Sequence, residues 1–149
     1  IFTTELKGDA GKAVKDIVEK SVRIQKYSAP IAAPACLLFG GETTVKVTGQ
    51  GKGGRNQHLA LLAANLLASE SGITLLAAGT DGTDGPTDAA GAIVNGDTVK
   101  HARKAGFPAE DYLMSHNSYE FFENTTGHLI TGPTLTNVMD LIIVLVDPV

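Results

Sequence analysis

Three aspartates lie close together in the polar segment Gly79–Asp88, directly after a run of apolar residues. They are Asp81, Asp84 and Asp88. Carboxylates this near one another repel unless a positive charge lies between them, and Mg²⁺ is bound by a few carboxylates together with phosphate oxygens. We therefore predict a metal site, and function is favoured most for Asp81, which follows the apolar run immediately. For Asp84 and Asp88 the alternative is turn formation, with Asp88 capping a helix.

A glycine-rich segment between a predicted strand and a predicted helix is the second candidate. Gly49-x-Gly51-x-x-Gly54 has the spacing of the dinucleotide-binding fingerprint, which would indicate NAD. Three features count against that interpretation. The preceding strand is predicted to be one arm of a hairpin, and no acidic residue ends the next strand about 20 residues on. That next strand is followed instead by the three aspartates, which suit a metal better than a ribose hydroxyl.

The same segment can still bind an anion. Glycines allow a close approach to the backbone, and the free N–H groups at a helix start attract phosphate. Lys52 and Arg55 add positive charge there. We predict phosphate or nucleotide binding by Gly51, Gly53, Gly54 and Lys52. The alternative is a glycine turn that only closes the helix onto the strand. No P-loop and no set of protein-kinase motifs occurs.

A third polar loop, Gly132–Asn137, precedes the last apolar run. Thr134 and Asn137 could bind an oxygen of a nucleotide or of a sugar acid, and the alternative is turn chemistry before a strand. The four histidines show no metal-ligand spacing, so we expect packing or surface roles for them. The single cysteine, Cys36, is expected to be a small buried hydrophobe, and a cytoplasmic setting is expected.

The elements that position these loops alternate between strands and helices, which predicts an α/β fold. Gly40-Gly41 is interpreted as a hairpin turn between two strands, so the sheet should be mixed. We predict a layered fold with a mixed, mostly parallel sheet and helices on both faces. Ligands in such sheets gather at the carboxyl ends of strands. The predicted helices are Ala10–Lys26, Asn56–Ser69, Thr98–Ala105, Ala109–Met114 and Ser118–Asn124. The predicted strands are Ile1–Thr4, Ala35–Phe39, Thr43–Thr48, Ile73–Ala78, Ala89–Val94 (or a short buried helix), His128–Thr131 and Leu141–Val146.

The totals limit the classes of partner. With 149 residues and a hydrophobic fraction of 43%, the chain suits one domain with a real core. The formal net charge is −4, and the basic residues are scattered. We therefore expect neither a nucleic acid nor a membrane as partner.

Four motifs taken together resemble one family. Gly40–Val45, Gly51–Gln57, Ala78–Ala92 and Thr131–Asn137 are similar, in this order, to the MOFRL domain. That domain is the C-terminal part of the glycerate 2-kinase family, whose members are often labelled hydroxypyruvate reductases. The resemblance implies that residues 1–149 form a single MOFRL-like domain and that the family's larger N-terminal domain is absent from this chain.

The resemblance also implies a reaction. Family members transfer the γ-phosphoryl group of ATP to the 2-hydroxyl of D-glycerate with Mg²⁺, in a cleft between the two domains, and the N-terminal domain supplies a lysine. By motif match, Arg55 is expected to stabilise the transferring phosphate, and Asp81 to act as metal ligand or base. Glu42 is expected in the cleft. Phosphoryl transfer depends on positioning and charge neutralisation, so these residue types suit it. The chain alone is expected to be inactive.

Two other functions remain open from the sequence. One is an NAD(P)H-dependent hydroxypyruvate reductase, motivated by the glycine spacing and by the family's common label. The other is a non-catalytic lid or assembly module that only shapes the cleft.

Overall fold

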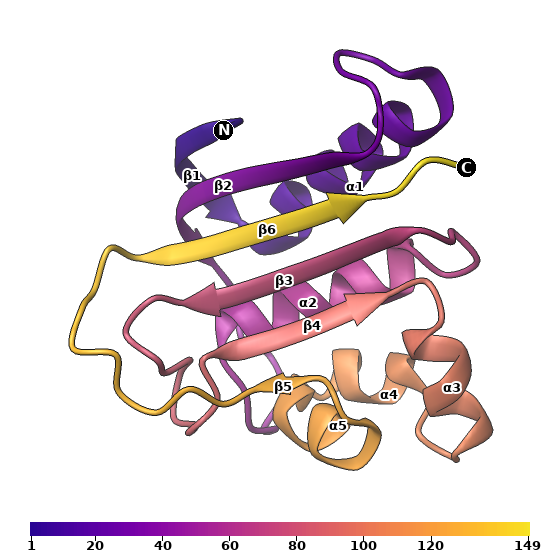
Figure 1. The fold of residues 1–149 in the computed structure, drawn as a ribbon. Helices are drawn as coiled ribbons and strands as arrows, with labels where there is room; N and C mark the ends of the chain where they lie inside the picture. The colour runs from indigo at the N-terminus through magenta and orange to yellow at the C-terminus, as the bar shows by residue number, and fades with distance from the viewer.

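The computed structural model describes residues 1–149 and contains a six-stranded sheet and five helices. The strands are β1 (Thr3–Asp9), β2 (Ala35–Thr44), β3 (Ile73–Gly79), β4 (Gly91–Asn95), β5 (His128–Leu129) and β6 (Asp140–Val146). The helices are α1 (Ala10–Tyr27), α2 (Arg55–Leu66), α3 (Thr98–Lys104), α4 (Ala109–Met114) and α5 (Ser118–Thr125). In the sheet the strands lie in the order β1-β2-β6-β3-β4-β5, so the last strand of the chain is central (Figure 1).

The predicted α/β class and the mixed sheet are confirmed, but the prediction of a mostly parallel sheet is wrong. Only β1 and β2 pair in parallel. The pairs β2–β6, β6–β3, β3–β4 and β4–β5 are all antiparallel. A parallel neighbour needs a crossover connection, and α1 supplies one only between β1 and β2. The loop after β3 instead returns the chain antiparallel as β4.

The predicted hairpin at Gly40-Gly41 does not form. Both glycines lie inside β2, which runs without a break past them to Thr44. Gly41 has φ +140°, and a Cβ atom there would lie 2.2 Å from the carbonyl oxygen of Leu6 in β1. The glycine is therefore required by the close approach of β1, and the sheet owes its mixed character to that parallel pairing.

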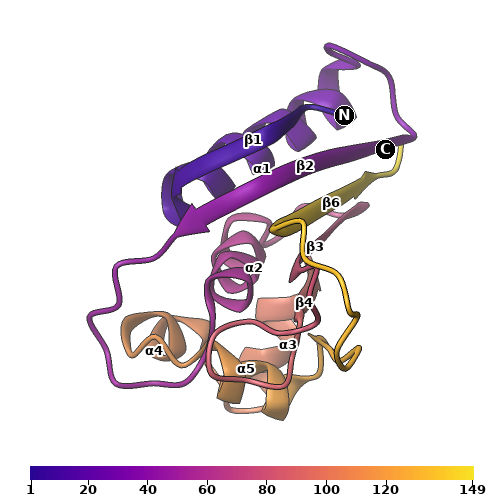
Figure 2. The same ribbon diagram turned by 90° about the vertical axis from the view of Figure 1, so that its left-hand side faces the viewer.

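Helices cover one face of the sheet, so the prediction of helices on both faces is also wrong. Figures 1 and 2 show α1 and α2 on the same side of the strands. Alternate residues of the central strands point to that side and are buried, with Leu37, Leu75 and Val144 each at most 1% exposed. On the opposite face Leu145 is 50% exposed, and Cys36, predicted to be buried, is also exposed.

The two long helices that the sequence predicted are present, and each is held firmly in place. Asp9 caps α1, since its Oδ1 accepts a hydrogen bond of 3.0 Å from the amide of Lys12. Helix α2 is buried around most of its circumference, and Leu59, Leu61 and Ala64 are fully buried. Because α2 is held on all these sides, its first turn has a fixed position relative to the ends of β2, β3 and β6.

Three strands meet where α2 begins. Asp140, the first residue of β6, is paired with Gly41 near the end of β2 and with Gly79 at the end of β3. The segments 45–54, 80–90 and 130–139 leave the sheet at this same end, which faces the viewer in Figure 2. The three polar loops that carry the predicted site residues therefore lie at one end of the sheet.

Candidate functional site

Arg55, the first residue of α2, is held by carboxylates from two strands. Its Nε and Nη2 atoms donate to the two oxygens of Asp140, at 2.7 and 3.0 Å. Its Nη1 atom forms an ion pair of 2.9 Å with Glu42 of β2. The hydrogen bond to Asp140 raises the pKa of Arg55 above its usual value, so this guanidinium is permanently charged. Asp140 is 4% exposed, whereas Glu42 is 52% exposed.

Asp81 lies in the loop that follows β3 and is tied to the loop before β6. Its Oδ1 accepts hydrogen bonds from the amide and the hydroxyl of Thr83, at 3.0 and 3.2 Å. The amide of Thr134 donates to the Asp81 carbonyl, at 3.1 Å. The side-chain nitrogen of Asn137 lies 3.4 Å from Asp81 Oδ2. The two loops that the sequence singled out separately therefore form one structure.

A small hollow of about 130 Å³ brings the main candidates together. Arg55, Asp81, Asn137 and Asp140 all line it. Three of these four residues were predicted from the sequence, and they come from α2, from the loop after β3 and from the loop before β6. A charged guanidinium and a partly free carboxylate facing one hollow can orient an anion together with a cation.

The structure does not bring the three aspartates together as the metal site that the sequence predicted. Both oxygens of Asp84 accept hydrogen bonds from the start of α2: Oδ1 from the amide of Asn56 at 3.1 Å, and Oδ2 from the amide of Gln57 at 2.8 Å. Burial raises the pKa of Asp84, against the effect of these hydrogen bonds. No group of three or more His, Cys, Asp or Glu side chains is placed to hold a metal ion. The anion at this helix start is thus the protein's own carboxylate.

Asp88 and Lys52 lie in a separate surface cluster. Tyr119 donates from its hydroxyl to Asp88, at 2.8 Å, and the Lys52 ammonium lies 3.9 Å from the centre of the Tyr119 ring. This hydrogen bond lowers the pKa of Asp88 and raises that of Tyr119. Neither Asp88 nor Lys52 lines the hollow at Arg55, so the structure separates both residues from the other predicted ones.

The glycine segment is packed against protein. Cβ atoms added at Gly51 and Gly53 would lie 2.4 Å from Asn117 Cβ and 2.2 Å from Ser118 Oγ, and one at Gly54 would lie 2.2 Å from the Asp84 carboxyl carbon. These close approaches explain the glycines without a ligand. The segment 45–54 is also not a strand that feeds a βαβ unit, so the dinucleotide-binding geometry is absent.

A larger hollow of about 620 Å³ is also lined by Arg55. Its lining includes Glu42, the three inner glycines of the segment and a group of polar side chains, namely Thr43, His58, His116 and Ser118. Each side chain of that group has a buried polar atom without a hydrogen-bond partner. The rings of His58 and His116 stack with their centres 4.7 Å apart. Buried polar atoms are nearly always paired, so these four atoms are exceptions, and all belong to residues that line this hollow.

Sequence reasoning gave Asp140 no role and missed the histidine pair. Asp140 precedes an apolar run and has the appearance of an ordinary strand start, and only its position between β2 and β3 reveals its contact with Arg55. His58 and His116 are 58 residues apart, so no local spacing could connect them. A hollow of about 1010 Å³ lies at the other end of the sheet, and none of the predicted site residues lines it.

The fold and the site define an α/β domain with an arginine–carboxylate site at one end of a mixed sheet. Residues 35–140 match the sequence model of the MOFRL family, and the chain belongs to this family. The family assignment made from the four motifs is thereby confirmed.

Relatives of the chain are much longer than it is. It is 49% identical to a D-glycerate 2-kinase of Thermotoga maritima over 98% of this chain and 35% of the relative. It is 46% identical to a glycerate 2-kinase of Pyrococcus horikoshii, over 98% of this chain and 33% of that relative. A protein of Agrobacterium vitis that bears the name of a hydroxypyruvate reductase is 39% identical over 98% of this chain and 34% of its own length. The chain thus spans about a third of these relatives.

Two solved structures are similar to the whole chain. The crystal structure of glycerate kinase from Thermotoga maritima superposes with a TM-score of 0.93 at 49% identity, covering 97% of this chain and 35% of that one. The structure of a Pyrococcus horikoshii protein gives 0.91 at 44% identity, covering 99% and 34%. None of the five helices combines the length and the hydropathy that a membrane-spanning helix requires.

Proposed function

We propose that this chain is the C-terminal half of a D-glycerate 2-kinase site, which transfers the γ-phosphoryl group of ATP to the 2-hydroxyl of D-glycerate. The observation that carries the proposal is the convergence of Arg55, Asp81 and Asn137 on one hollow at the end of the sheet. The choice of D-glycerate as substrate is supported by relatives named glycerate kinase, with which this chain shares 49% sequence identity. The other half of the site belongs to a preceding domain of a longer polypeptide, acting in the cytoplasm.

Arg55 is the residue that binds the transferring phosphate. Asp140 engages the guanidinium from its Nε side, which leaves N–H groups on both terminal nitrogens for a ligand. In the transition state of phosphoryl transfer, negative charge is spread over three oxygens of the transferring group. A fixed guanidinium lowers the energy of this transition state more than that of the bound substrate. Arg55 lines both hollows, so it lies where two bound substrates would meet.

The residues present fit a magnesium ion with one protein carboxylate. Mg²⁺ usually keeps several waters and takes one or two carboxylates plus phosphate oxygens, so Asp81 alone suffices. Asp81 Oδ2 has only the long contact to Asn137. Four carboxylates (Glu42, Asp81, Asp84 and Asp140) but only one Lys or Arg side chain line the two hollows, a formal charge of −4 + 1 = −3. A divalent cation would relieve this excess and neutralise the phosphates.

The larger hollow fits the nucleotide. Its volume of about 620 Å³ lies within the range of small-molecule sites. Thr43, His58, His116 and Ser118 line it and make its wall polar. In this assignment Gly51, Gly53 and Gly54 form a backbone wall of the larger hollow. Asn137 lines the smaller hollow on the glycerate side, and Thr134 fixes the loop of Asp81 through its amide.

The decisive experiment is an ATP-dependent phosphorylation assay with D-glycerate on the longer polypeptide that contains this chain. We expect 2-phosphoglycerate, identified by mass and by the phosphorus NMR of the phosphate position, and no product from the 149-residue chain by itself. Arg55→Ala should abolish nearly all turnover. Full turnover by this variant would favour a non-catalytic lid or assembly role instead.

A reductase is the alternative that the names of some relatives suggest. It requires a nicotinamide site, and the packed glycine segment offers none of the geometry of the dinucleotide fold. Loss of NADH or NADPH absorbance with hydroxypyruvate, in the absence of ATP, would establish the reductase and overturn the kinase assignment.

A further inference from the structure

We propose that Asp140 is the positioning residue of this site and acts by fixing the Arg55 guanidinium. The inference rests on the proposed function of Arg55. It assigns a role to a residue whose sequence context, at the start of an apolar strand, gives no sign of chemistry.

The geometry of the pair is that of a two-point clamp. Asp140 accepts from Nε and Nη2 with different oxygens, at 2.7 and 3.0 Å, so the plane of the guanidinium cannot turn about a single bond. Asn56 donates to Asp140 Oδ1 at 3.0 Å from its side chain, which holds the carboxylate from a further direction. Asp140 is 4% exposed, so water does not compete for these contacts.

The position of Asp140 is itself rigid. It is the first residue of the central strand β6, and its backbone is paired on both sides, with Gly41 of β2 and Gly79 of β3. Glu42, the other carboxylate at Arg55, is about half exposed and makes a single contact. Asp140 therefore sets the orientation of the Arg55 guanidinium, and Glu42 can release Nη1 of Arg55 when a phosphate binds.

This division of roles predicts how the clamp affects catalysis. A guanidinium that is free to rotate still attracts a phosphate but no longer points at the position where charge develops. Misplacing a catalytic group by about 1 Å can lower the rate about 100-fold. Because Asp140 acts through Arg55, its loss should cost little once Arg55 is gone.

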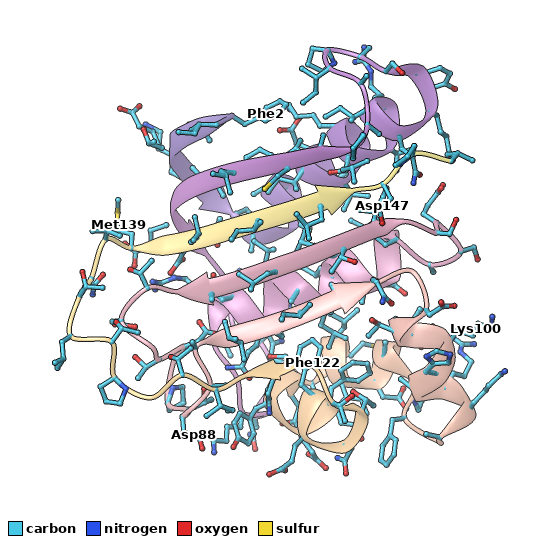
Figure 3. All side chains as sticks on the ribbon, in the orientation of Figure 1. Phe2, Asp88, Lys100, Phe122, Met139 and Asp147 are labelled. Carbon is cyan, nitrogen blue, oxygen red and sulfur yellow. The ribbon has the colours of Figure 1, made fainter.

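The test uses the longer polypeptide, with Asp140→Asn as the variant. Asparagine keeps the shape but turns an acceptor oxygen into an NH₂ group that faces the guanidinium. We expect kcat to fall about 100-fold with KM unchanged. Asp147→Asn, at the other end of β6 (Figure 3), is the matched control and should behave as the wild type. A kcat for Asp140→Asn within about twofold of the wild type, or losses that multiply in the double variant with Arg55→Ala, would overturn the proposal.

Chemical rescue gives a second readout, and its comparisons of two cations and of Glu42→Gln need no Asp140 variant. In Arg55→Ala the vacated space keeps the Asp140 carboxylate, so millimolar guanidinium should restore part of the activity and methylammonium, which cannot bind at two points, should not. Rescue should persist in Arg55→Ala/Glu42→Gln and vanish in Arg55→Ala/Asp140→Asn. Equal rescue by both cations, or loss of rescue through Glu42→Gln alone, would contradict the assignment.

A third readout separates this inference from the kinase proposal. In nitrogen-15 NMR spectra of the longer polypeptide, a clamped Arg55 should give a sharp Nε–H signal that exchanges slowly, and Asp140→Asn should remove it while Asp147→Asn leaves it. If the wild type lacks kinase activity but shows this signal, the kinase proposal fails and the clamp stands. If the wild type is active and the signal is absent or insensitive to Asp140→Asn, the clamp fails alone.

Discussion

Asp84 holds the first turn of α2 through Gln57, whose amide donates to Asp84 Oδ2 at 2.8 Å and whose side-chain nitrogen lies 3.2 Å from the same oxygen. The second oxygen is occupied by Asn56 in the same way. Asp84 is 3% exposed and lies 27 residues beyond Gln57 in the sequence, so a distant loop supplies the cap that α2 lacks locally.

Asp84→Ala should therefore destabilise the domain rather than remove a metal ligand. Two buried amides lose their acceptor, which costs about 2–3 kcal/mol of unfolding free energy. Urea unfolding followed by circular dichroism, with EDTA present, measures this loss, and Asp88→Ala at the exposed end of the same loop is the control. A loss of stability that appears only when magnesium is present would instead restore Asp84 as a metal ligand.

The contact between Gly53 and Ser118 gives a test of what the glycine segment is for. A Cβ at Gly53 would lie 2.2 Å from Ser118 Oγ but 3.5 Å from Ser118 Cβ. Gly53→Ala should cost about 1–3 kcal/mol through overpacking, and most of this should return in Gly53→Ala/Ser118→Ala. Ser118→Ala by itself removes a hydroxyl without a partner and should be close to neutral. Equal costs of Gly53→Ala in both backgrounds would contradict the packing explanation.

Local patterns were enough for the elements whose causes are local. Helix α1 has a periodic apolar face and a cap at Asp9, and β3 and β6 are continuous apolar runs, so these elements could be predicted from neighbouring residues. Gly40-Gly41 was misinterpreted because the residue that requires Gly41 is Leu6, on a strand that pairs with β2 from 35 residues away. Strand direction failed for the same reason, since it depends on which distant strand pairs with which.

The candidate site divides in a similar way. Arg55 and Asp81 could be found because each stands at the end of an element beside other polar residues. Asp140 could not, because its contact with Arg55 follows from the insertion of β6 between β2 and β3. The separation of Asp88 from Asp81 also depends on a distant partner, Tyr119.

His58 should make the stability of the domain depend on pH. Burial, followed by the neighbouring His116, lowers the pKa of His58 from 6.5 to about 4. Between these pH values His58 is protonated in the unfolded chain but not in the folded chain. The free energy of unfolding therefore falls as the pH drops from about 6.5 towards 4. One such proton gives a slope of at most about 1.4 kcal/mol per pH unit, and partial exposure of the ring reduces it.

Urea unfolding at several pH values between 7.5 and 5 measures this slope. His58→Gln should flatten it, whereas His101→Gln, on the exposed side of α3, should leave it unchanged. An unaltered slope in His58→Gln would mean that another group causes the acid sensitivity. Burial raises the pKa of Asp84, so this group contributes with the opposite sign, and the comparison of His58→Gln with the wild type cancels it because both contain Asp84.

Asp81→Asn separates catalysis from stability in the same loop. The oxygen of an asparagine can still accept the hydrogen bonds from Thr83, so the loop should keep its shape and its unfolding free energy. The charge that would bind magnesium and steady the phosphates is lost, and kcat should fall by a factor on the order of 100–1,000 in the longer polypeptide. Asp88→Asn, which disturbs only the contact with Tyr119, should keep wild-type activity. A magnesium titration tests whether Asp81 binds the metal. The Mg²⁺ concentration that gives the half-maximal rate should rise in Asp81→Asn and stay at the wild-type value in Asp88→Asn. Activity of Asp81→Asn within about twofold of the wild type would remove Asp81 from the site and leave Arg55 without its metal-binding partner.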